Sequence, residues 1–156
     1  MVSPLIGLHA AFGEIGIVAF IWVFVELLNP TPKTIKRAKI AALLGVILFF
    51  LSWIVGGYYY LYTYSANVKP LIKVGPQPWA HEIFTEIKEH VFLFLPFISL
   101  FTYSLLRKHE KNLPTDKKAR RAILYLCVLI VIIGALMGLM GYLISTGART
   151  ALEVKP

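Results

Sequence analysis

Four apolar segments alternate with short polar connections along the chain. They cover about Pro4–Leu28, Ile40–Tyr64, Ile83–Leu106 and Ala122–Ser145. Each is longer than the roughly 20 residues that an α-helix needs to cross the ~30 Å hydrocarbon layer of a bilayer. Helices are expected, because backbone groups in lipid must be hydrogen-bonded within their own segment. The pattern predicts one all-α integral membrane domain over residues 1–156, an antiparallel up-down-up-down four-helix bundle with helices at about 4–28, 40–64, 79–107 and 121–146.

The composition favours the same class of protein. Hydrophobic residues make up 58% of the 156-residue chain, and its mean hydropathy is +0.71, whereas soluble domains are about 45–50% apolar. The first segment has no basic stretch before it and no clear cleavage site, so we expect a retained span and not a signal peptide. The lipid bilayer is therefore the first partner that the sequence predicts.

Basic residues are distributed unevenly between the connections. The net charge is +8; the connection between the first two segments carries four Lys or Arg residues, and Arg107–Arg121 carries seven. The remaining five are Lys69, Lys73, Lys88, Arg149 and Lys155. By the positive-inside rule both basic connections are cytoplasmic, so both termini and the Ser65–Pro78 connection are extracytoplasmic in a cell membrane. The positive charge indicates topology, and we expect no nucleic-acid partner.

The extracytoplasmic ends of the spans have their own patterns. Tyrosines that predict an aromatic belt end the second segment: Tyr58, Tyr59, Tyr60, Tyr62 and Tyr64. The Ser65–Pro78 connection contains three prolines and a glycine, which predict a short, stiff loop. Pro96 predicts a kink in the middle of the third segment. Small residues that favour close helix packing recur in the fourth segment: Gly134, Gly138 and Gly141.

The third segment begins with an unusual number of ionisable residues. Because each residue on a helix turns by about 100°, Glu82, Glu86 and His90 form one stripe. A second stripe lies beside it and consists of His81, Thr85, Lys88 and Glu89. A buried charge is unfavourable unless it is paired, ligated or neutralised. The function therefore depends on what this polar arc faces.

The first segment contains a histidine and a carboxylate among small residues. His9, Gly13 and Gly16 follow helical spacing, so the histidine stands over a groove without side chains. Glu14 lies at least two turns inside the apolar run, and a carboxylate there is a functional-site hypothesis by default. Its simpler interpretation is a protonated carboxyl bonded to another helix. In either case we expect Glu14 to face the bundle interior.

Several of these groups are predicted to lie at one depth. With a rise of ~1.5 Å per residue and the basic connections aligned, His9, Glu14 and His90 fall in one layer of the extracytoplasmic half. Glycines of two other helices share that layer: Gly56, Gly57 and Gly138. Polar ligands beside missing side chains favour a flat, bulky cofactor such as a porphyrin, because an ion needs ligands but no vacated volume.

This arrangement resembles the small four-helix membrane b-type cytochromes, in which histidines from two helices ligate a haem iron from both faces. The resemblance covers the four spans. It implies a single haem b near the extracytoplasmic face, since the cytoplasmic half lacks the second histidine pair of two-haem families. The residues that would contact this haem are His9, His90, His81, Gly13, Gly57 and Gly138. Ligation by two histidines leaves no open position on the iron, so the resemblance implies an electron carrier and not a stand-alone enzyme.

The same resemblance implies partners. Electrons would pass near the extracytoplasmic face, with a quinone and an extracytoplasmic redox protein as candidate partners. The haem propionates would pair with one or more nearby cations: Lys69, Lys73, Lys88 or Arg149.

Three other functions fit the sequence. The first is an iron, zinc or manganese site without porphyrin. Its ligands would come from His9, His90, His81, Glu14 and Glu86. The second and fourth segments offer no charged ligand, however, whereas di-iron bundles use all four helices. The second alternative is a non-catalytic subunit of a larger membrane complex or homo-oligomer. The third is proton or ion transport with Glu14 as the carrier.

Overall fold

The computed structural model describes residues 3–154, and this part of the chain is all-helical, as predicted. Four long helical runs are apolar enough to cross a membrane: Pro4–Leu28, Pro32–Val74, Ala80–His109 and Lys117–Glu153. Between residues 3 and 154 there is no β-strand. The predicted position of the termini rests partly on residues 1–2 and on Lys155 and Pro156, which lie outside the described part.

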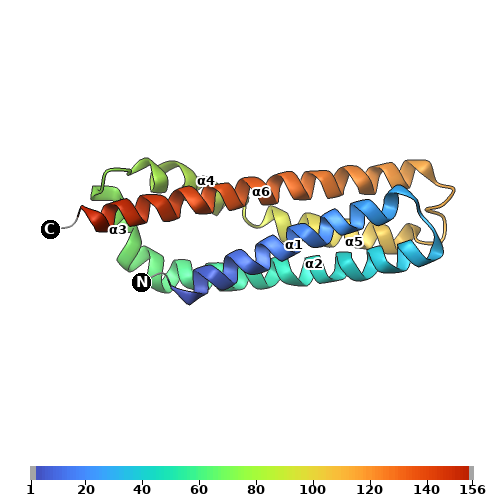
Figure 1. Ribbon diagram of the computed structural model, residues 1–156, viewed down its shortest axis with the longest axis horizontal. Coiled ribbons are helices and arrows are strands. Elements are labelled where there is room, and N and C mark those ends of the chain that lie inside the picture. Colours follow the sequence, from blue (N-terminus) through green and yellow to red (C-terminus); the bar gives the residue numbers. More distant parts are fainter. Residues whose placement is uncertain (1–2, 155–156) are drawn as a thin grey trace.

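The four runs lie side by side along one long axis (Figure 1). Helix α1 (Pro4–Leu28) packs against α2 (Pro32–Tyr59) and α6 (Lys117–Glu153), and α5 (Phe94–His109) packs against the same two helices. The α1–α2 and α5–α6 connections lie at one end of the molecule, which we call the basic end. The start of α1 and the end of α6 lie at the other end, and we call that half the outer half.

Capping residues place the helix starts at the basic end. The side chain of Thr31 accepts from the backbone N–H of Thr34 at 3.2 Å, while Thr34 Oγ1 accepts from the backbone N–H of Thr31 at 2.7 Å. Pro32 occupies the first turn, where its missing N–H removes no hydrogen bond. Helix α2 therefore begins before the predicted Ile40, so most of the basic stretch is helical. Asp116 caps α6 through the backbone N–H groups of residues 118 and 119.

The predicted outer loop is mostly helical instead. Helix α2 continues without interruption into a π-helical segment, η1 (Tyr60–Val68), and then into α3 (Lys69–Val74). Pro70 lies in the first turn of α3, where the π-helical segment ends. Helix α6 likewise runs past the predicted residue 146, and its small side chains pack closely: Cβ atoms added at Gly75 and Gly147 would lie 2.7 Å and 2.6 Å from those of Ala151 and Ala80.

The third run is broken into pieces. A π-helical segment, η2 (Ala80–Thr85), leads into α4 (Glu86–Val91), and two turn residues, Phe92 and Leu93, separate α4 from α5. Pro96 follows in the first turn of α5. Because proline has no N–H for the carbonyl four residues earlier, which is that of Phe92, the helix breaks there. The interruption agrees with the predicted kink.

The core lies where α1 and α2 cross. Phe20 is fully buried, and its ring stacks on that of Phe49 with the centroids 5.9 Å apart. The two rings occupy space that glycines leave free: a Cβ at Gly16 would lie 2.8 Å from Phe49, and one at Gly45 would lie 2.7 Å from Phe20. Glycine at both positions therefore allows the helices to approach closely.

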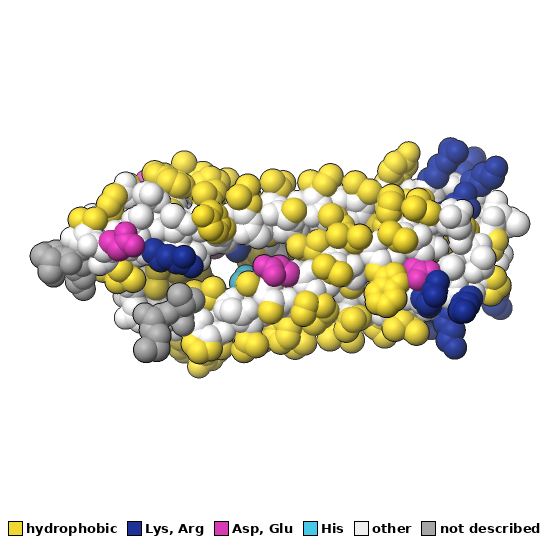
Figure 2. All heavy atoms as spheres, in the orientation of Figure 1, with side chains coloured by type: hydrophobic (Ala, Val, Ile, Leu, Met, Phe, Trp, Pro, Cys, Tyr) yellow, Lys and Arg dark blue, Asp and Glu magenta, His cyan; other side chains and the backbone are white. Residues whose placement is uncertain are grey.

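Large apolar side chains cover the outside of the bundle along its length, and the Lys and Arg side chains of this face gather mostly at the basic end (Figure 2). At that end Arg37 pairs with Glu26 at 2.8 Å, and the Trp22 indole N–H donates to the same carboxylate. Lys39 pairs with Glu110, and this hydrogen bond holds the pKa of the Glu110 carboxyl below its ordinary value. These pairs tie α1 to α2 and α2 to the α5–α6 connection.

Candidate functional site in the outer half

His9 is held by α2. Its Nδ1 lies 2.8 Å from the backbone oxygen of Ser52, and Ser52 Oγ donates to the backbone oxygen of His9 at 2.8 Å. Since a carbonyl only accepts, Nδ1 carries the proton and Nε2 keeps its lone pair. A Cβ at Gly56 would lie 2.5 Å from His9 Nδ1, whereas a Cβ at Gly57 would meet nothing within 4 Å. The glycine that seats the histidine is therefore Gly56.

The other two glycines predicted for the site lie apart from the imidazole. A Cβ at Gly13 would lie 3.4 Å from Ser52 Oγ, so this glycine gives room to the serine. A Cβ at Gly138 would meet nothing within 4 Å. The contact between Gly138 and a bound group stays a prediction.

Only one of the two polar stripes of the third run faces the interior. His81 and Thr85 are buried, and Lys88 and Glu89 are partly buried. The residues of the other stripe are exposed: Glu82, Glu86 and His90. Two predicted site residues, Glu86 and His90, thus lie on the outer surface.

His81 belongs to a buried hydrogen-bonded network. The Tyr64 hydroxyl lies 3.1 Å from His81 Nδ1 and 2.9 Å from Thr85 Oγ1. His81 is 1% exposed, and its Nε2 has no hydrogen-bond partner within the described residues. The nearest carboxylate oxygen, Glu86 Oε1, lies 3.9 Å from Nε2, which is too far for a hydrogen bond. Both π-helical segments contribute to this network, and π-helical turns occur frequently at functional sites.

The sequence assigned Tyr64 to the aromatic belt and not to this network. Tyr58 and Tyr62 are 55% and 68% exposed, as expected for an aromatic belt, but Tyr64 is 4% exposed. The π-helical geometry of η1 turns it inward. A usable signal was the i, i+4 spacing of His81 and Thr85, which places two hydrogen-bonding side chains on one face.

His90 does not meet His9. Its Nδ1 lies 2.7 Å from the backbone oxygen of Glu86 in the preceding turn, and the side chain is exposed. Lys88 precedes it by two residues and therefore points about 200° away, to the other side of α4. The prediction that His9 and His90 face one another across the bundle is wrong for this structure. Its physical reason is that His81 and Thr85 are bonded to Tyr64 in the interior, which turns the opposite side of the helix, with His90, outward.

Glu14 is exposed, and the prediction that it faces the interior is also wrong. The adjacent faces of α1 are occupied by other contacts. Gly13 lies against Ser52 and Gly16 against Phe49 on α2, while Ile17 lies against Gly134 on α6. Glu14 is left on the remaining side of the helix. Within an apolar segment, an exposed carboxylate is unusual.

Lys88 reaches from α4 to α6. Its Nζ would lie 3.4 Å from a Cβ added at Gly141. Among residues 3–154 no carboxylate lies within ion-pair distance of this ammonium group. The sequence placed Lys88 in the polar arc but assigned it only as one of four candidate partners for a propionate.

The predicted metal ligands are not gathered. His9 lies against α2 and His81 against Tyr64, while Glu14, Glu86 and His90 are exposed. In the described part of the chain, no three His, Cys, Asp or Glu side chains form a group that would hold a metal ion. The alternative of a metal ion without porphyrin has no geometric support here.

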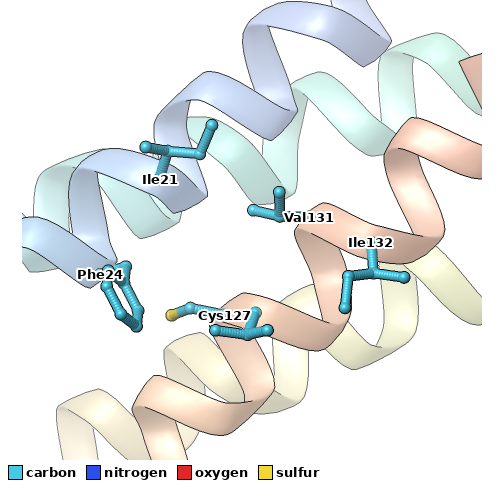
Figure 3. Close-up of a pocket in the computed structure, with 6 residues that line it drawn as sticks. Ile21, Phe24, Cys127, Val131 and Ile132 are labelled. Atoms are coloured by element: carbon cyan, nitrogen blue, oxygen red, sulfur yellow. The ribbon is translucent and has the colours of Figure 1, made fainter.

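The basic half contains an apolar groove between α1 and α6 (Figure 3). Its volume is about 160 Å³, and its lining is Ile21, Phe24, Cys127, Val128, Val131 and Ile132. These side chains offer no strong hydrogen-bonding group. This groove therefore holds no polar candidate for the site.

No protein-family model, curated protein or solved structure matches this chain.

Proposed function

We propose that the chain is an integral membrane protein whose four helical runs cross the bilayer in alternating directions. The support is the belt of exposed large apolar side chains, such as Val18 at 59%, Ile54 at 58% and Leu139 at 55%. In water such a surface would be unfavourable, whereas in lipid it requires no partner. By the positive-inside rule the basic end is cytoplasmic and the outer half is extracytoplasmic.

Single cysteines test this topology. In a background in which Cys127 is replaced by serine, Lys111→Cys should react with a membrane-impermeant thiol reagent only after the membrane is opened. Lys73→Cys should react in intact cells. Lys111 lies in the α5–α6 connection and Lys73 lies in α3 at the opposite end of the bundle, and both are exposed. The reverse labelling pattern would overturn the assignment of the two faces.

Within this membrane domain we propose binding of a b-type haem in the outer half and electron transfer near the extracytoplasmic face. The observation that supports the proposal is the orientation of His9, whose Nδ1 lies 2.8 Å from the backbone oxygen of Ser52, which leaves Nε2 as the nitrogen available to a metal. A bound haem would supply reversible one-electron chemistry at its iron.

The residues fit a haem unequally. His9 faces inward, its tautomer is fixed, and Lys88 provides an interior cation that would suit a propionate. His90 has the same tautomer but is exposed, and the unpartnered Nε2 of His81 is buried beside η1. We therefore assign His9 as one histidine that would hold the haem and His81 as the other.

Absorption spectra of histidine variants test the assignment. His9→Ala should remove or strongly shift the Soret band of the purified protein, and His81→Ala should do the same, whereas His90→Ala should leave it unchanged. His109→Ala is the matched control, because His109 lies at the basic end, and it should leave the band unchanged. A His9→Ala protein with an unaltered haem spectrum would exclude His9 as a ligand.

A second candidate function is a subunit of a larger membrane assembly. Exposed Glu14 favours it, because a carboxylate facing hydrocarbon is unfavourable until a polar group of another helix covers it. Replacement of Glu14 by glutamine should preserve folding, since an amide and a neutral carboxyl have similar shape and hydrogen-bonding capacity.

The oligomer distribution in mild detergent tests whether the chain assembles through Glu14. If Glu14 binds a neighbouring subunit as a carboxylate, Glu14→Gln should shift the complex to smaller species in native mass spectrometry. Val18→Gln, one turn further along the exposed surface of α1, is a control for polarity alone. Equal oligomer distributions for Glu14→Gln and the wild type would remove Glu14 from the interface.

A further inference from the structure

A cavity lies at the basic end, between the last turn of α5 and the first turns of α6. Its volume is about 400 Å³, which is within the roughly 300–1,000 Å³ of small-molecule sites. Its lining combines three polar side chains with several apolar ones: His109, Asp116, Lys118, Leu105, Ala122 and Ile123. A single cavity therefore joins charged groups of the helix ends to the apolar surface of the bundle.

The charge left uncompensated in this cavity is positive. Asp116 Oδ1 accepts from the backbone N–H groups of Lys118 and Ala119, so the start of α6 compensates the carboxylate. Its Oδ2 lies 3.8 Å from Nδ1 of His109, which is too far for a hydrogen bond. Among residues 3–154 no carboxylate lies within ion-pair distance of the Lys118 ammonium group. Arg121 follows three residues later on the same side of α6 and is exposed. The cavity therefore favours an anion.

The apolar side of the cavity continues towards the middle of the bundle. Ala122 is exposed and begins the fourth apolar segment. One turn deeper, Phe101 lies on the same side of α5 as Leu105 and is 55% exposed, while Leu126 lies on the same side of α6 as Ala122. An occupant with an anionic group beside Lys118 would therefore have room for an alkyl chain along α5 and α6. This combination favours a phospholipid over free phosphate, which has no apolar part.

We infer that the cavity between α5 and α6 binds the phosphodiester head group of an anionic phospholipid, phosphatidylglycerol, from the cytoplasmic leaflet. Lys118 donates to a phosphate oxygen, and the charge of Arg121 adds to the attraction. A glycerol hydroxyl of the head group donates to Oδ2 of Asp116, and one acyl chain lies along the groove that begins at Ala122. Basic pockets between transmembrane helices on the cytoplasmic side suit such head groups. The inference rests on the proposed membrane location and does not involve the haem.

Native mass spectrometry of the detergent-purified protein with added lipid tests the site. The wild type should retain one phosphatidylglycerol per chain. It should bind phosphatidylethanolamine with the same acyl chains about fivefold more weakly or less, because the ammonium of that head group cancels the charge of its phosphate. Lys118→Gln removes one cation and should weaken phosphatidylglycerol binding about fivefold. Ala122→Phe fills the groove from an exposed position and should abolish retention of the lipid.

Two matched controls separate this site from the basic end as a whole. Lys117→Gln removes the same charge from the neighbouring residue, which does not line the cavity, and Ala135→Phe adds the same bulk at an exposed position further along α6. Both variants should bind phosphatidylglycerol as the wild type does.

Four results would overturn the inference. They are equal losses of binding in Lys117→Gln and Lys118→Gln, equal retention of the two lipids, unchanged retention by Ala122→Phe, and saturable binding of inorganic phosphate in place of the lipid. A protein that fractionates with the membrane but shows any of these results would lose this site and keep the proposed membrane domain. A protein recovered in the soluble fraction would contradict both.

Discussion

Gly56→Ala should unseat His9, whereas Gly57→Ala should not. A Cβ at position 56 would lie 2.5 Å from Nδ1 and 2.8 Å from Cε1 of His9, distances that packed atoms do not adopt. The imidazole would have to move away and lose its hydrogen bond to Ser52. Overpacking of this kind destabilises by about 1–3 kcal/mol, and we expect a lower Tm together with loss of any ligand that His9 binds.

The neighbouring glycine is the matched control. A Cβ at position 57 would meet nothing within 4 Å, and alanine is favoured over glycine inside a helix by up to ~1 kcal/mol. Gly57→Ala should therefore be neutral or slightly stabilising. Thermal unfolding in detergent, followed by circular dichroism, measures both variants. Equal Tm values for the two would mean that His9 does not lie against Gly56.

His81→Ala should destabilise the protein strongly, and His90→Ala should not. His81 is 1% exposed and is bonded to Tyr64, so its removal leaves a cavity and takes one partner from a buried hydroxyl. Large-to-small replacements at such positions lower the free energy of unfolding by about 2–5 kcal/mol. His90 is exposed, and only its own helix binds it. Its replacement should change the free energy of unfolding by about 0.5 kcal/mol or less.

Titration of the two histidine variants with guanidinium or sodium dodecyl sulfate measures their free energies of unfolding. Tyr64→Phe gives an independent measure of the network, because it removes the hydroxyl and keeps the ring. The free energy of unfolding of Tyr64→Phe should lie between those of the wild type and of His81→Ala. If His90→Ala proved the more damaging of the two histidine variants, the inward and outward stripes of the third run would be exchanged.

Hydrophobic patterning predicted the four apolar helices because segment length and polarity are properties of the sequence alone. It also predicted that His9 and Gly56 lie at one level, since the rise per residue of a helix is fixed. The rotation of each helix about its axis was harder to obtain. Glu14 and His90 were expected inside, but the contacts of Gly13, Gly16 and Ile17, and those of His81 and Thr85, turn them outward.

Local backbone geometry accounts for the other differences. The prolines and the glycine of residues 65–78 predicted a loop, but the chain stays helical through Pro70, which lies where η1 passes into α3. The π-helical segments η1 and η2 shift the angular position of every residue that follows, so counting at 100° per residue could not bring Tyr64 to His81. The small residues Gly134, Gly138 and Gly141 indicated close helix packing but not the partner.

The most direct test of the central proposal is the reduced-minus-oxidised absorption spectrum of the purified wild-type protein, expressed with haem supplied. A b-type haem should give a Soret band and sharp α and β bands on reduction, at about one haem per chain. The same bands should be lost in His9→Ala and kept in His109→Ala. A folded wild-type protein without haem bands would contradict the proposal. The second candidate function, assembly with another subunit through Glu14, would then remain.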